Sequence, residues 1–203
     1  MLKRSEEMDQ NIRKALKQAA IYHKDGVRKG TDVPYIIHPF EVAMILQENG
    51  MEARIIVAGL LHDTLEDTEM TEEQLQEEFG EDILHLVLGA SEKLEGRKET
   101  LWEERKKHTI EYLQTAPLDV KYIICADKLS NIRSMLDEYK KEGEKLWDRF
   151  MNSDKRINGQ EYSREYKREK QKWYYENLVK NLQELEGLKM YQELKEAVRN
   201  LFG

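Results

Sequence analysis

The sequence predicts an all-α protein, and three observations support this fold class. Glycine (11) and proline (3) are scarce among the 203 residues, while Glu, Lys, Leu and Gln, which favour helices, are abundant. Apolar residues recur at helical spacing in several segments that have capping signals at their ends. Residues 53–65 form an almost continuous apolar run that is too short to span a membrane, and such a run predicts a buried central helix.

Four helices are expected in the first half of the chain, over 9–23, 38–49, 53–65 and 72–79. Asp25-Gly26 ends the first and Asn49-Gly50 ends the second, because glycine readily adopts the left-handed conformation that follows a helix. Pro39 suits the first turn of the second helix. Thr71 and Gln74 have the spacing of a capping box, which predicts the start of the fourth helix.

The second half is expected to hold four more helices, over 82 to about 93, 117–136, 173–185 and 191–202. Gly80 precedes the first of these, Pro117 opens the second, and the last two are amphipathic. Between them, the charged segment 140–172 contains Asn152-Ser153-Asp154 and Asn158-Gly159, which predict an exposed loop. We expect a single domain over 1–203, with a core at about 9–140 and a C-terminal helical extension at about 141–203.

The composition narrows the possible partners and compartment. The 33 basic and 40 acidic residues are interspersed and leave a net charge of −7, so no basic surface for nucleic acid is expected. Cys125 is the single cysteine and lies in an apolar run, which predicts a core residue and excludes an intramolecular disulfide. We find neither a signal peptide nor a membrane span, so a cytoplasmic location is expected. The oligomeric state is not predicted.

The most informative feature is His62-Asp63 at the end of the apolar run, followed by Glu66 and Asp67 on the next turn. Burying carboxylates beside imidazoles costs several kcal/mol unless a cation or another partner compensates. A divalent metal supplies that compensation. The sequence therefore predicts a metal site here.

Two further residues of metal-ligand type occur on other expected helices. His38 begins the second helix. Asp127 directly follows an apolar run on the expected helix over 117–136, and a carboxylate buried there needs a partner. That partner is either the predicted metal or Lys128. Two imidazoles and two carboxylates suit Mn²⁺, Fe²⁺, Zn²⁺ or Ni²⁺, and spacing alone does not choose among them.

A divalent ion activates water for attack on a phosphate ester, so the expected chemistry is hydrolysis of a phosphate. Glu66 and Asp67 would orient that water or move its proton. Arg28-Lys29 would neutralise phosphate oxygens, and Asn131, one turn after Asp127, would bind a sugar or base. Arg28-Lys29 and Asn131 each have a simpler alternative, the first as a solvated loop and the second as a surface or core amide. Tyr35 either contacts the ligand or packs the loop on the core.

The order of these motifs resembles the HD hydrolase domain of the RelA/SpoT family. The matching segments are, in chain order, Arg28-Lys29, Pro34 to Pro39, Leu60 to Thr68, Phe79-Gly80, and Ala126 to Arg133. The length resembles that of the stand-alone small alarmone hydrolases of the metazoan SpoT-homologue type. The resemblance implies an all-helical HD-domain bundle that binds Mn²⁺ and removes the 3′-pyrophosphate of guanosine tetra- and pentaphosphate. No alarmone synthesis is expected.

Transferred to this sequence, the resemblance implies metal ligands at His38, His62, Asp63 and Asp127, and catalytic roles for Glu66 and Asp67. It also implies phosphate contacts from Arg28 and Lys29, with Tyr35 and Asn131 near the nucleoside. Three departures bear on substrate choice: the segment 89–93, Ser130 in place of a frequent histidine, and the charged segment 140–172. Two other functions therefore stay open: an HD phosphohydrolase acting on another nucleotide or on NADPH, and a non-catalytic nucleotide sensor.

Overall fold

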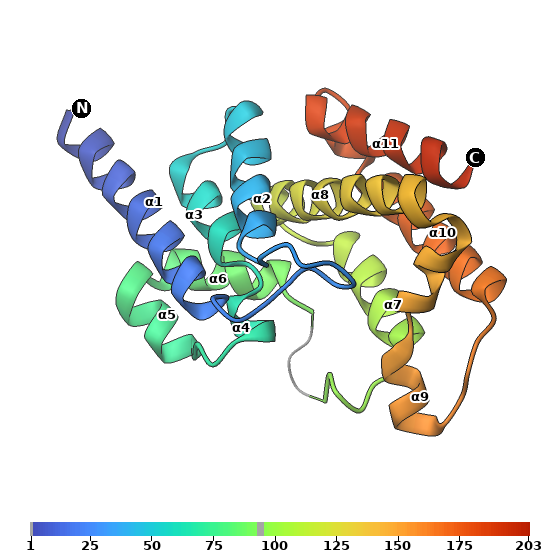
Figure 1. The fold of residues 1–203 in the computed structure, drawn as a ribbon. Coiled ribbons are helices and arrows are strands. Elements are labelled where there is room, and N and C mark those ends of the chain that lie inside the picture. The colour runs from blue at the N-terminus through green and yellow to red at the C-terminus, as the bar shows by residue number, and fades with distance from the viewer. Residues whose placement is uncertain (1, 93–95) are drawn as a thin grey trace. The chain divides into compact units, whose positions relative to one another are not determined.

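The prediction of an all-α fold is confirmed by a computed structural model of the chain (Figure 1). The structure describes the backbone of residues 2–92 and 96–203, and the side chains of these ranges from residue 10 onward. Over these ranges helices predominate and no strand forms. The only bridge of β type there joins Val27 to Pro34 in the loop after the first helix.

The chain forms two compact units. One comprises Met1–Glu92 and Pro117–Ser130, and the other comprises Lys93–Ala116 and Asn131–Gly203. The long helix α8 (Leu118–Glu142) contributes its first half to the first unit and its second half to the second. The expected division into a core at 9–140 and an extension at 141–203 stays a prediction.

The first unit is built around the buried helix α3 (Ala53–Leu61), whose residues from Ile55 to Leu61 are all buried. Helix α3 packs against α1 (Leu2–Tyr22), α2 (Ile37–Glu48) and α6 (Glu81–Ala90). Gly59 permits the approach of α2, because a Cβ atom at this position would lie 2.5 Å from Cδ1 of Leu46. The predicted buried central helix is therefore present, and its lack of a polar face reflects neighbours on several sides.

The predicted helix over 53–65 is wrong in one respect, since it is interrupted at His62-Asp63. Helix α3 ends at Leu61, and a short helix, α4 (Thr64–Asp67), follows in a new direction. Side chains occupy carbonyl groups that a continuous helix would use: Nδ1 of His62 lies 2.8 Å from the Gly59 oxygen, and the Thr64 hydroxyl donates to the Leu61 oxygen at 2.7 Å.

The next two helices follow their local signals. Helix α5 (Glu72–Phe79) begins with the predicted capping box, in which Thr71 accepts from the Gln74 amide while the Gln74 side chain accepts from the Thr71 amide. Gly80, with φ of +88°, separates α5 from α6. Helix α6 ends at Ala90, earlier than predicted, and the predicted end near Lys93 lies outside the described residues.

The second unit contains more helix than the sequence predicted. Besides the end of α8 it holds these elements: α7 (Trp102–Leu113), η1 (Gly143–Arg149), α9 (Asn152–Asn158), α10 (Arg164–Asn181), η2 (Gln183–Leu185) and α11 (Lys189–Phe202). Helix α10 packs against α7, η1 and α11. The two predicted C-terminal amphipathic helices correspond to α10 with η2 and to α11.

The expected exposed loop is confirmed only at 159–163, after Asn158-Gly159, and is wrong for the rest of 140–172, which is mostly helical and is ordered by buried contacts. Trp147 is fully buried and stacks on Phe202, with 5.7 Å between the ring centroids. Asp154 is also buried, and its carboxylate accepts a hydrogen bond from the Trp102 amide at 2.9 Å. Charged residues dominate this segment, but a few apolar side chains and one buried carboxylate decide its structure.

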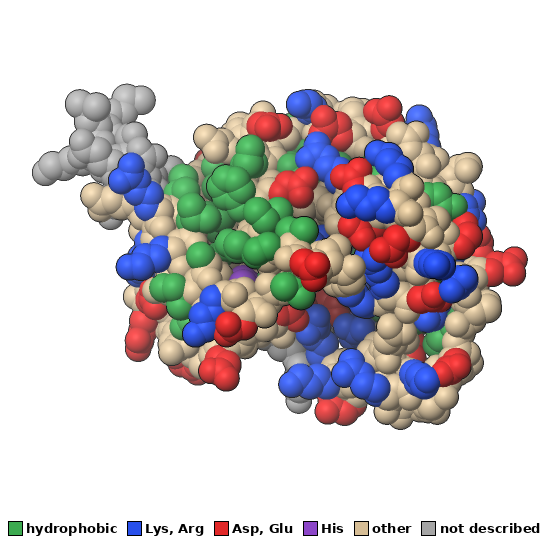
Figure 2. Space-filling model, viewed as in Figure 1, with side chains coloured by type: hydrophobic (Ala, Val, Ile, Leu, Met, Phe, Trp, Pro, Cys, Tyr) green, Lys and Arg blue, Asp and Glu red, His purple; other side chains and the backbone are tan. Residues whose placement is uncertain are grey.

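Two surface features belong to single units. In the first unit, Figure 2 shows hydrophobic side chains gathered over the region of α1 and α2, where Ile37, Phe40 and Met44 are exposed.

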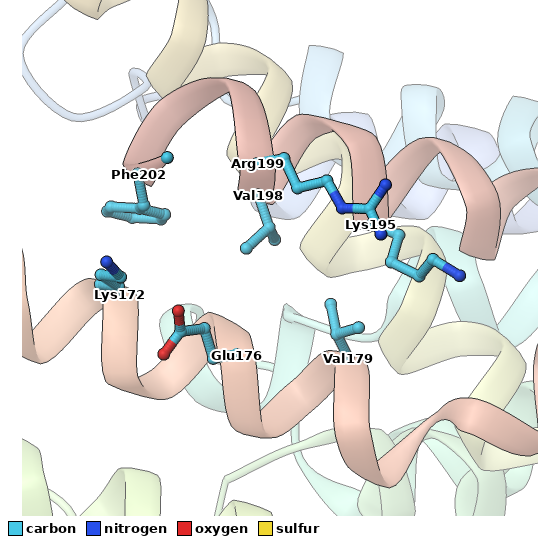
Figure 3. A pocket seen from close by; sticks show the side chains of 8 residues that line it. Lys172, Glu176, Val179, Lys195, Val198, Arg199 and Phe202 are labelled. Carbon is cyan, nitrogen blue, oxygen red and sulfur yellow. The ribbon is translucent and has the colours of Figure 1, made fainter.

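In the second unit, α10 and α11 border a pocket of about 420 Å³ (Figure 3), lined by Lys172, Glu176, Val179, Lys195, Val198, Arg199, Phe202 and Gly203. Glu176 is its one metal-ligand side chain, so this pocket is a poor candidate for a metal site.

No helix among the described residues is both long enough and apolar enough to cross a membrane.

Candidate metal centre

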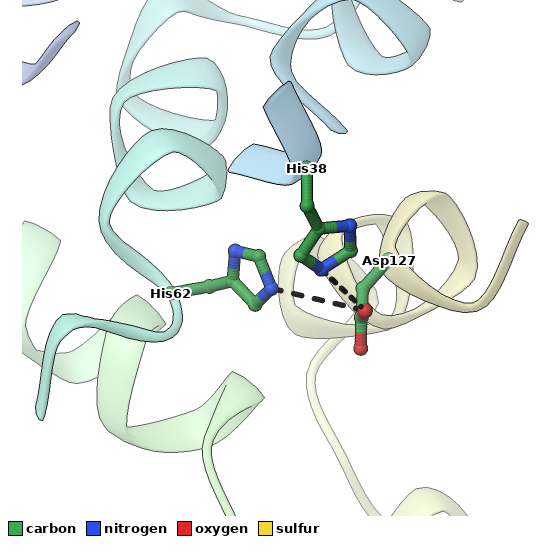
Figure 4. Close-up of side chains that lie close together, drawn as sticks. All are labelled: His38, His62 and Asp127. Atoms are coloured by element: carbon green, nitrogen blue, oxygen red, sulfur yellow. Dashed lines mark ion pairs between the residues drawn. The ribbon is translucent and has the colours of Figure 1, made fainter. Parts of the chain in front are cut away.

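Three elements of the first unit bring ligand-type side chains together. His38 lies in the first turn of α2, His62 lies at the end of α3, and Asp127 lies on α8. One atom from each side chain can be chosen so that the three lie within 4.8 Å of one another, and all three residues are buried. Figure 4 shows both imidazole rings directed toward the Asp127 carboxylate.

Asp63, at the bend between α3 and α4, directs its carboxylate to the same place. Its Oδ2 atom lies 3.1 Å from Nε2 of His62 and 3.5 Å from Nε2 of His38. Oδ1 of Asp127 lies 3.2 Å from Nε2 of His38 and 3.8 Å from Nε2 of His62. The structure thus brings together all four residues that the sequence predicted as metal ligands.

The state of the His62 ring shows that this cluster fits a cation. In a neutral imidazole one nitrogen donates and the other accepts. Nδ1 faces the Gly59 carbonyl oxygen at 2.8 Å and therefore carries a proton, which leaves Nε2 as the nitrogen that can hold a second proton or a cation. Nε2 is buried and has no hydrogen-bond partner among the described residues. Beside two carboxylates, a positive charge is favourable at this nitrogen, and either a second proton or a divalent ion that takes the proton's place would supply it.

Nδ1 of His38 has a different partner. It lies 2.8 Å from the hydroxyl oxygen of Ser130, and that hydroxyl donates to Oε2 of Glu41 at 2.9 Å. Glu41 lies one turn after His38 on α2, and Ser130 lies one turn after Asp127 on α8. Sequence reasoning considered Ser130 only in relation to substrate and missed Glu41. The i, i+3 spacing of an acidic residue after His38 was the available signal.

Electrostatic interactions keep both carboxylates of the cluster ionised. Burial tends to raise the pKa of Asp63, but the His62 and His38 imidazoles outweigh it and hold that pKa below its usual range. Burial acts in the same way on Asp127, where Lys128 and both imidazoles bring the pKa well below its ordinary value. Conversely, burial lowers the pKa of His62, and the carboxylates of Asp63 and Asp127 raise it well above its ordinary value. The site therefore attracts positive charge.

Asp127 pairs with Lys128, one of the two partners that the sequence allowed, and the predicted metal as its other partner stays a prediction. Its Oδ2 atom accepts from Nζ of Lys128 at 2.5 Å, while Oδ1 faces the two imidazoles. The ion pair therefore leaves one carboxylate oxygen directed toward the candidate metal position.

Glu66 and Asp67, the predicted catalytic residues, lie on α4. Glu66 is half-buried, and its Oε1 atom accepts from the Glu92 backbone amide at 2.6 Å, so part of this carboxylate supports the segment after α6. Asp67 is exposed. Their catalytic roles stay predictions.

The predicted substrate-binding residues have different environments. The Tyr35 hydroxyl donates to Oδ2 of Asp63 at 2.6 Å, so Tyr35 contacts a candidate metal ligand as well as packing its loop. The Arg28 guanidinium lies 5.7 Å from the centroid of the Tyr35 ring, and Lys29 is exposed beside it. Asn131 is half-buried on α8, one turn after Asp127. Contact of these residues with a substrate stays a prediction.

His23, to which sequence reasoning gave no role, is buried beside this site. Its ring packs on Tyr35, with 4.8 Å between centroids, and its Nε2 atom has no hydrogen-bond partner among the described residues. Burial lowers the pKa of His23, and Asp63 opposes the shift only in part. The five-residue spacing before Arg28-Lys29 gave no periodic signal that would single it out.

The chain matches a protein-family model and several curated proteins. A family model described as an HD domain matches residues 15–154, a range that includes all four candidate ligands. A GTP pyrophosphokinase of Myxococcus xanthus is 38% identical over 129 residues, or 61% of this chain and 17% of that protein. A guanosine-3′,5′-bis(diphosphate) 3′-pyrophosphohydrolase of Aquifex aeolicus is 39% identical over 130 residues, or 62% of this chain and 18% of that protein. The chain thus spans under a fifth of the length of these relatives.

Two solved structures match over most of their length. A crystal structure from Listeria monocytogenes is 34% identical, with a TM-score of 0.67, and the match covers 85% of this chain and all of that one. The structure of a metazoan orthologue of SpoT, described as hydrolysing ppGpp with a role in starvation responses, is 25% identical. Its TM-score is 0.71, and the match covers 93% of this chain and 94% of that one.

Proposed function

The chain belongs to the HD-domain family, and on that basis we propose that it is a metal-dependent phosphohydrolase whose substrate is guanosine tetra- or pentaphosphate. The observation that carries the proposal is the convergence of His38, His62, Asp63 and Asp127, with the buried Nε2 atom of His62 facing both carboxylates. We assign these four residues as ligands of one divalent ion, and we propose that this ion is Mn²⁺.

The chemistry follows from this assignment. A divalent ion bound there supplies positive charge that activates water and offsets the charge of a phosphate. Asp67, exposed on α4, would accept or return a proton at its carboxylate, and Glu66 would help to orient the water through the oxygen that does not accept from Glu92. Arg28 and Lys29 would hold phosphate oxygens at the loop that precedes His38.

The choice of substrate is supported by two similarities. The Aquifex aeolicus relative carries the name of a 3′-pyrophosphohydrolase of guanosine bis(diphosphate), and the metazoan orthologue is described as hydrolysing ppGpp. The Myxococcus xanthus relative is named a kinase, but this chain spans 17% of that protein. We therefore favour hydrolysis, with release of pyrophosphate and formation of GDP or GTP, and we assign Asn131 and Tyr35 to the nucleoside side of the site.

The first test is an assay of purified protein with Mn²⁺ for release of pyrophosphate and of monophosphate. Guanosine tetraphosphate, NADPH and simple nucleotides are compared, each with and without a chelator. Chelator-sensitive pyrophosphate release from the tetraphosphate is the expected result. Monophosphate release from another nucleotide alone would overturn the substrate proposal, and metal binding with no turnover of any nucleotide would instead indicate a sensor.

Variants separate metal binding from turnover. Asp63→Ala and Asp127→Ala are expected to lose bound metal and activity together, because each removes a ligand. Asp67→Asn is expected to retain metal and lose about 10²–10⁴-fold in turnover, which is the usual contribution of a general acid or base. Metal content is measured by elemental analysis. Normal activity of Asp127→Ala at full metal content would remove Asp127 from the site.

A further inference from the structure

Three side chains form a continuous hydrogen-bonded series beside the candidate metal position. Nδ1 of His38 lies 2.8 Å from Oγ of Ser130, and the Ser130 hydroxyl donates to Oε2 of Glu41 at 2.9 Å. His38 and Ser130 are each 1% exposed, so water does not compete for the contact between them. Glu41 is half-buried.

The direction of the second hydrogen bond determines the direction of the first. A serine hydroxyl has one proton, and here the Glu41 carboxylate, which can only accept, receives it. Toward His38 the Ser130 oxygen must therefore accept, so the imidazole proton lies on Nδ1. The lone pair then lies on Nε2, the nitrogen that is 3.2 Å from Asp127 and 3.5 Å from Asp63.

We propose that Ser130 and Glu41 are positioning residues, which hold the His38 proton on Nδ1 and so keep Nε2 available to a divalent ion. The proposal rests on the proposed function, since the ion is the one assigned to this site. His62 achieves the same orientation through a backbone carbonyl, that of Gly59. A hydrogen-bond partner on the far nitrogen is a general requirement of a metal-binding histidine.

The same contacts connect the helices that carry two of the ligands. Glu41 lies three residues after His38 on α2, and Ser130 lies three residues after Asp127 on α8. Residues at this spacing share one face of a helix. The Ser130 hydroxyl therefore ties α8 to α2 next to the ligands that these helices contribute, and it fixes the rotation of the His38 ring as well as its tautomer.

The tautomer of His38 is the direct test. Nitrogen NMR of metal-free protein labelled in histidine distinguishes a protonated ring nitrogen from one with a lone pair. We expect His38 of the natural sequence to carry its proton on Nδ1, and Ser130→Ala to shift it toward a mixture of tautomers. The nitrogen signals of His62, whose Nδ1 atom faces the Gly59 oxygen, are the internal control and should not change. An unchanged His38 tautomer in Ser130→Ala would overturn the proposal.

Substitution of Glu41 tests the directional argument. In Glu41→Ala the Ser130 hydroxyl is free to donate to Nδ1, so the proton should move toward Nε2. In Glu41→Gln an amide oxygen can still accept from Ser130, so the tautomer should stay largely as in the natural sequence. A change in both variants, or in neither, would contradict the series as proposed.

Metal affinity completes the test, measured by calorimetric titration with Mn²⁺. We expect Ser130→Ala to lose about 10–100-fold in affinity, the usual effect of removing such a partner. Ser134→Ala, one turn further along α8, removes the same group and should bind as tightly as the natural sequence. Equal affinities of Ser130→Ala and Ser134→Ala would overturn the role of Ser130. Absence of Mn²⁺ binding in the natural sequence would overturn the proposed function, and the metal-free tautomer would then decide this proposal alone.

Discussion

At the scale of single residues, environment alone makes histidines of one chain behave differently. His62 and His23 are both buried. The carboxylates of Asp63 and Asp127 raise the pKa of His62 well above its ordinary value, whereas burial dominates at His23 and lowers its pKa. One imidazole therefore belongs to a charged cluster, and the other acts as a neutral aromatic ring that packs on Tyr35.

His23 gives a pH-dependent stability with a definite sign. Because its pKa is lower in the folded protein than in the unfolded chain, the unfolded chain binds more protons as the pH falls below about 6.5. This proton binding lowers the free energy of unfolding. The loss is absent above that pH, and it grows on acidification until the pKa of His23 in the folded protein is reached. For one proton its slope cannot exceed about 1.4 kcal/mol per pH unit.

We therefore expect His23→Gln to reduce the loss of stability between pH 7.5 and pH 5. Urea unfolding of both proteins at several pH values measures this, and the difference between them removes the contributions of the nearby Asp63, His38 and His62. His85→Gln is the control, since His85 is exposed. Identical pH dependence in the natural sequence and His23→Gln would show that His23 is not the source.

At the scale of elements, the close contact of α2 with α3 positions two of the candidate ligands. His38 begins α2 and His62 follows α3, so the separation of these helices sets the separation of the two imidazoles. Gly59 allows the contact, since a side chain there would meet Leu46. Its carbonyl oxygen also faces Nδ1 of His62. One glycine thus serves both the packing of the two helices and the orientation of a candidate ligand.

Gly59→Ala is expected to destabilise the protein by about 1–3 kcal/mol, because overpacking forces side chains or helices apart. Urea unfolding measures the stability, and Mn²⁺ titration shows whether the shift reaches the ligands. Gly187→Ala is the matched control, since a Cβ atom there meets nothing within 4 Å. Equal stability of the two variants would mean that Leu46 moves aside without cost.

At the scale of the whole molecule, the four candidate ligands all belong to one of the two compact units. That unit combines Met1–Glu92 with Pro117–Ser130, so it closes only when α8 joins the helices that precede it. A bound ion would link residues from both stretches, and it should stabilise this unit by mass action against any opening that separates them.

Cys125 reports such opening, because it is fully buried on α8, two residues before Asp127. Burial also raises the pKa of its thiol to about 12. We expect a thiol reagent to label Cys125 slowly, and Mn²⁺ at about 100 times its dissociation constant to slow the reaction up to about 100-fold. Asp63→Ala should show no effect of Mn²⁺. If Mn²⁺ does not change the labelling rate of the natural sequence, Cys125 becomes accessible without loss of the metal site.

The sequence by itself determined the all-α class, the buried central helix and the capping box at Thr71, because each depends on local composition, periodicity or spacing. It also singled out the residues that converge, since imidazoles and carboxylates in apolar segments need a common partner. The tertiary structure alone decided the bend at His62-Asp63 and the order of the charged segment after Lys140. It also decided the pairing of His38 with Ser130, 92 residues away in the chain. Such contacts have no local signature, because they depend on which helices pack together and on which carbonyls and hydroxyls they bring within reach.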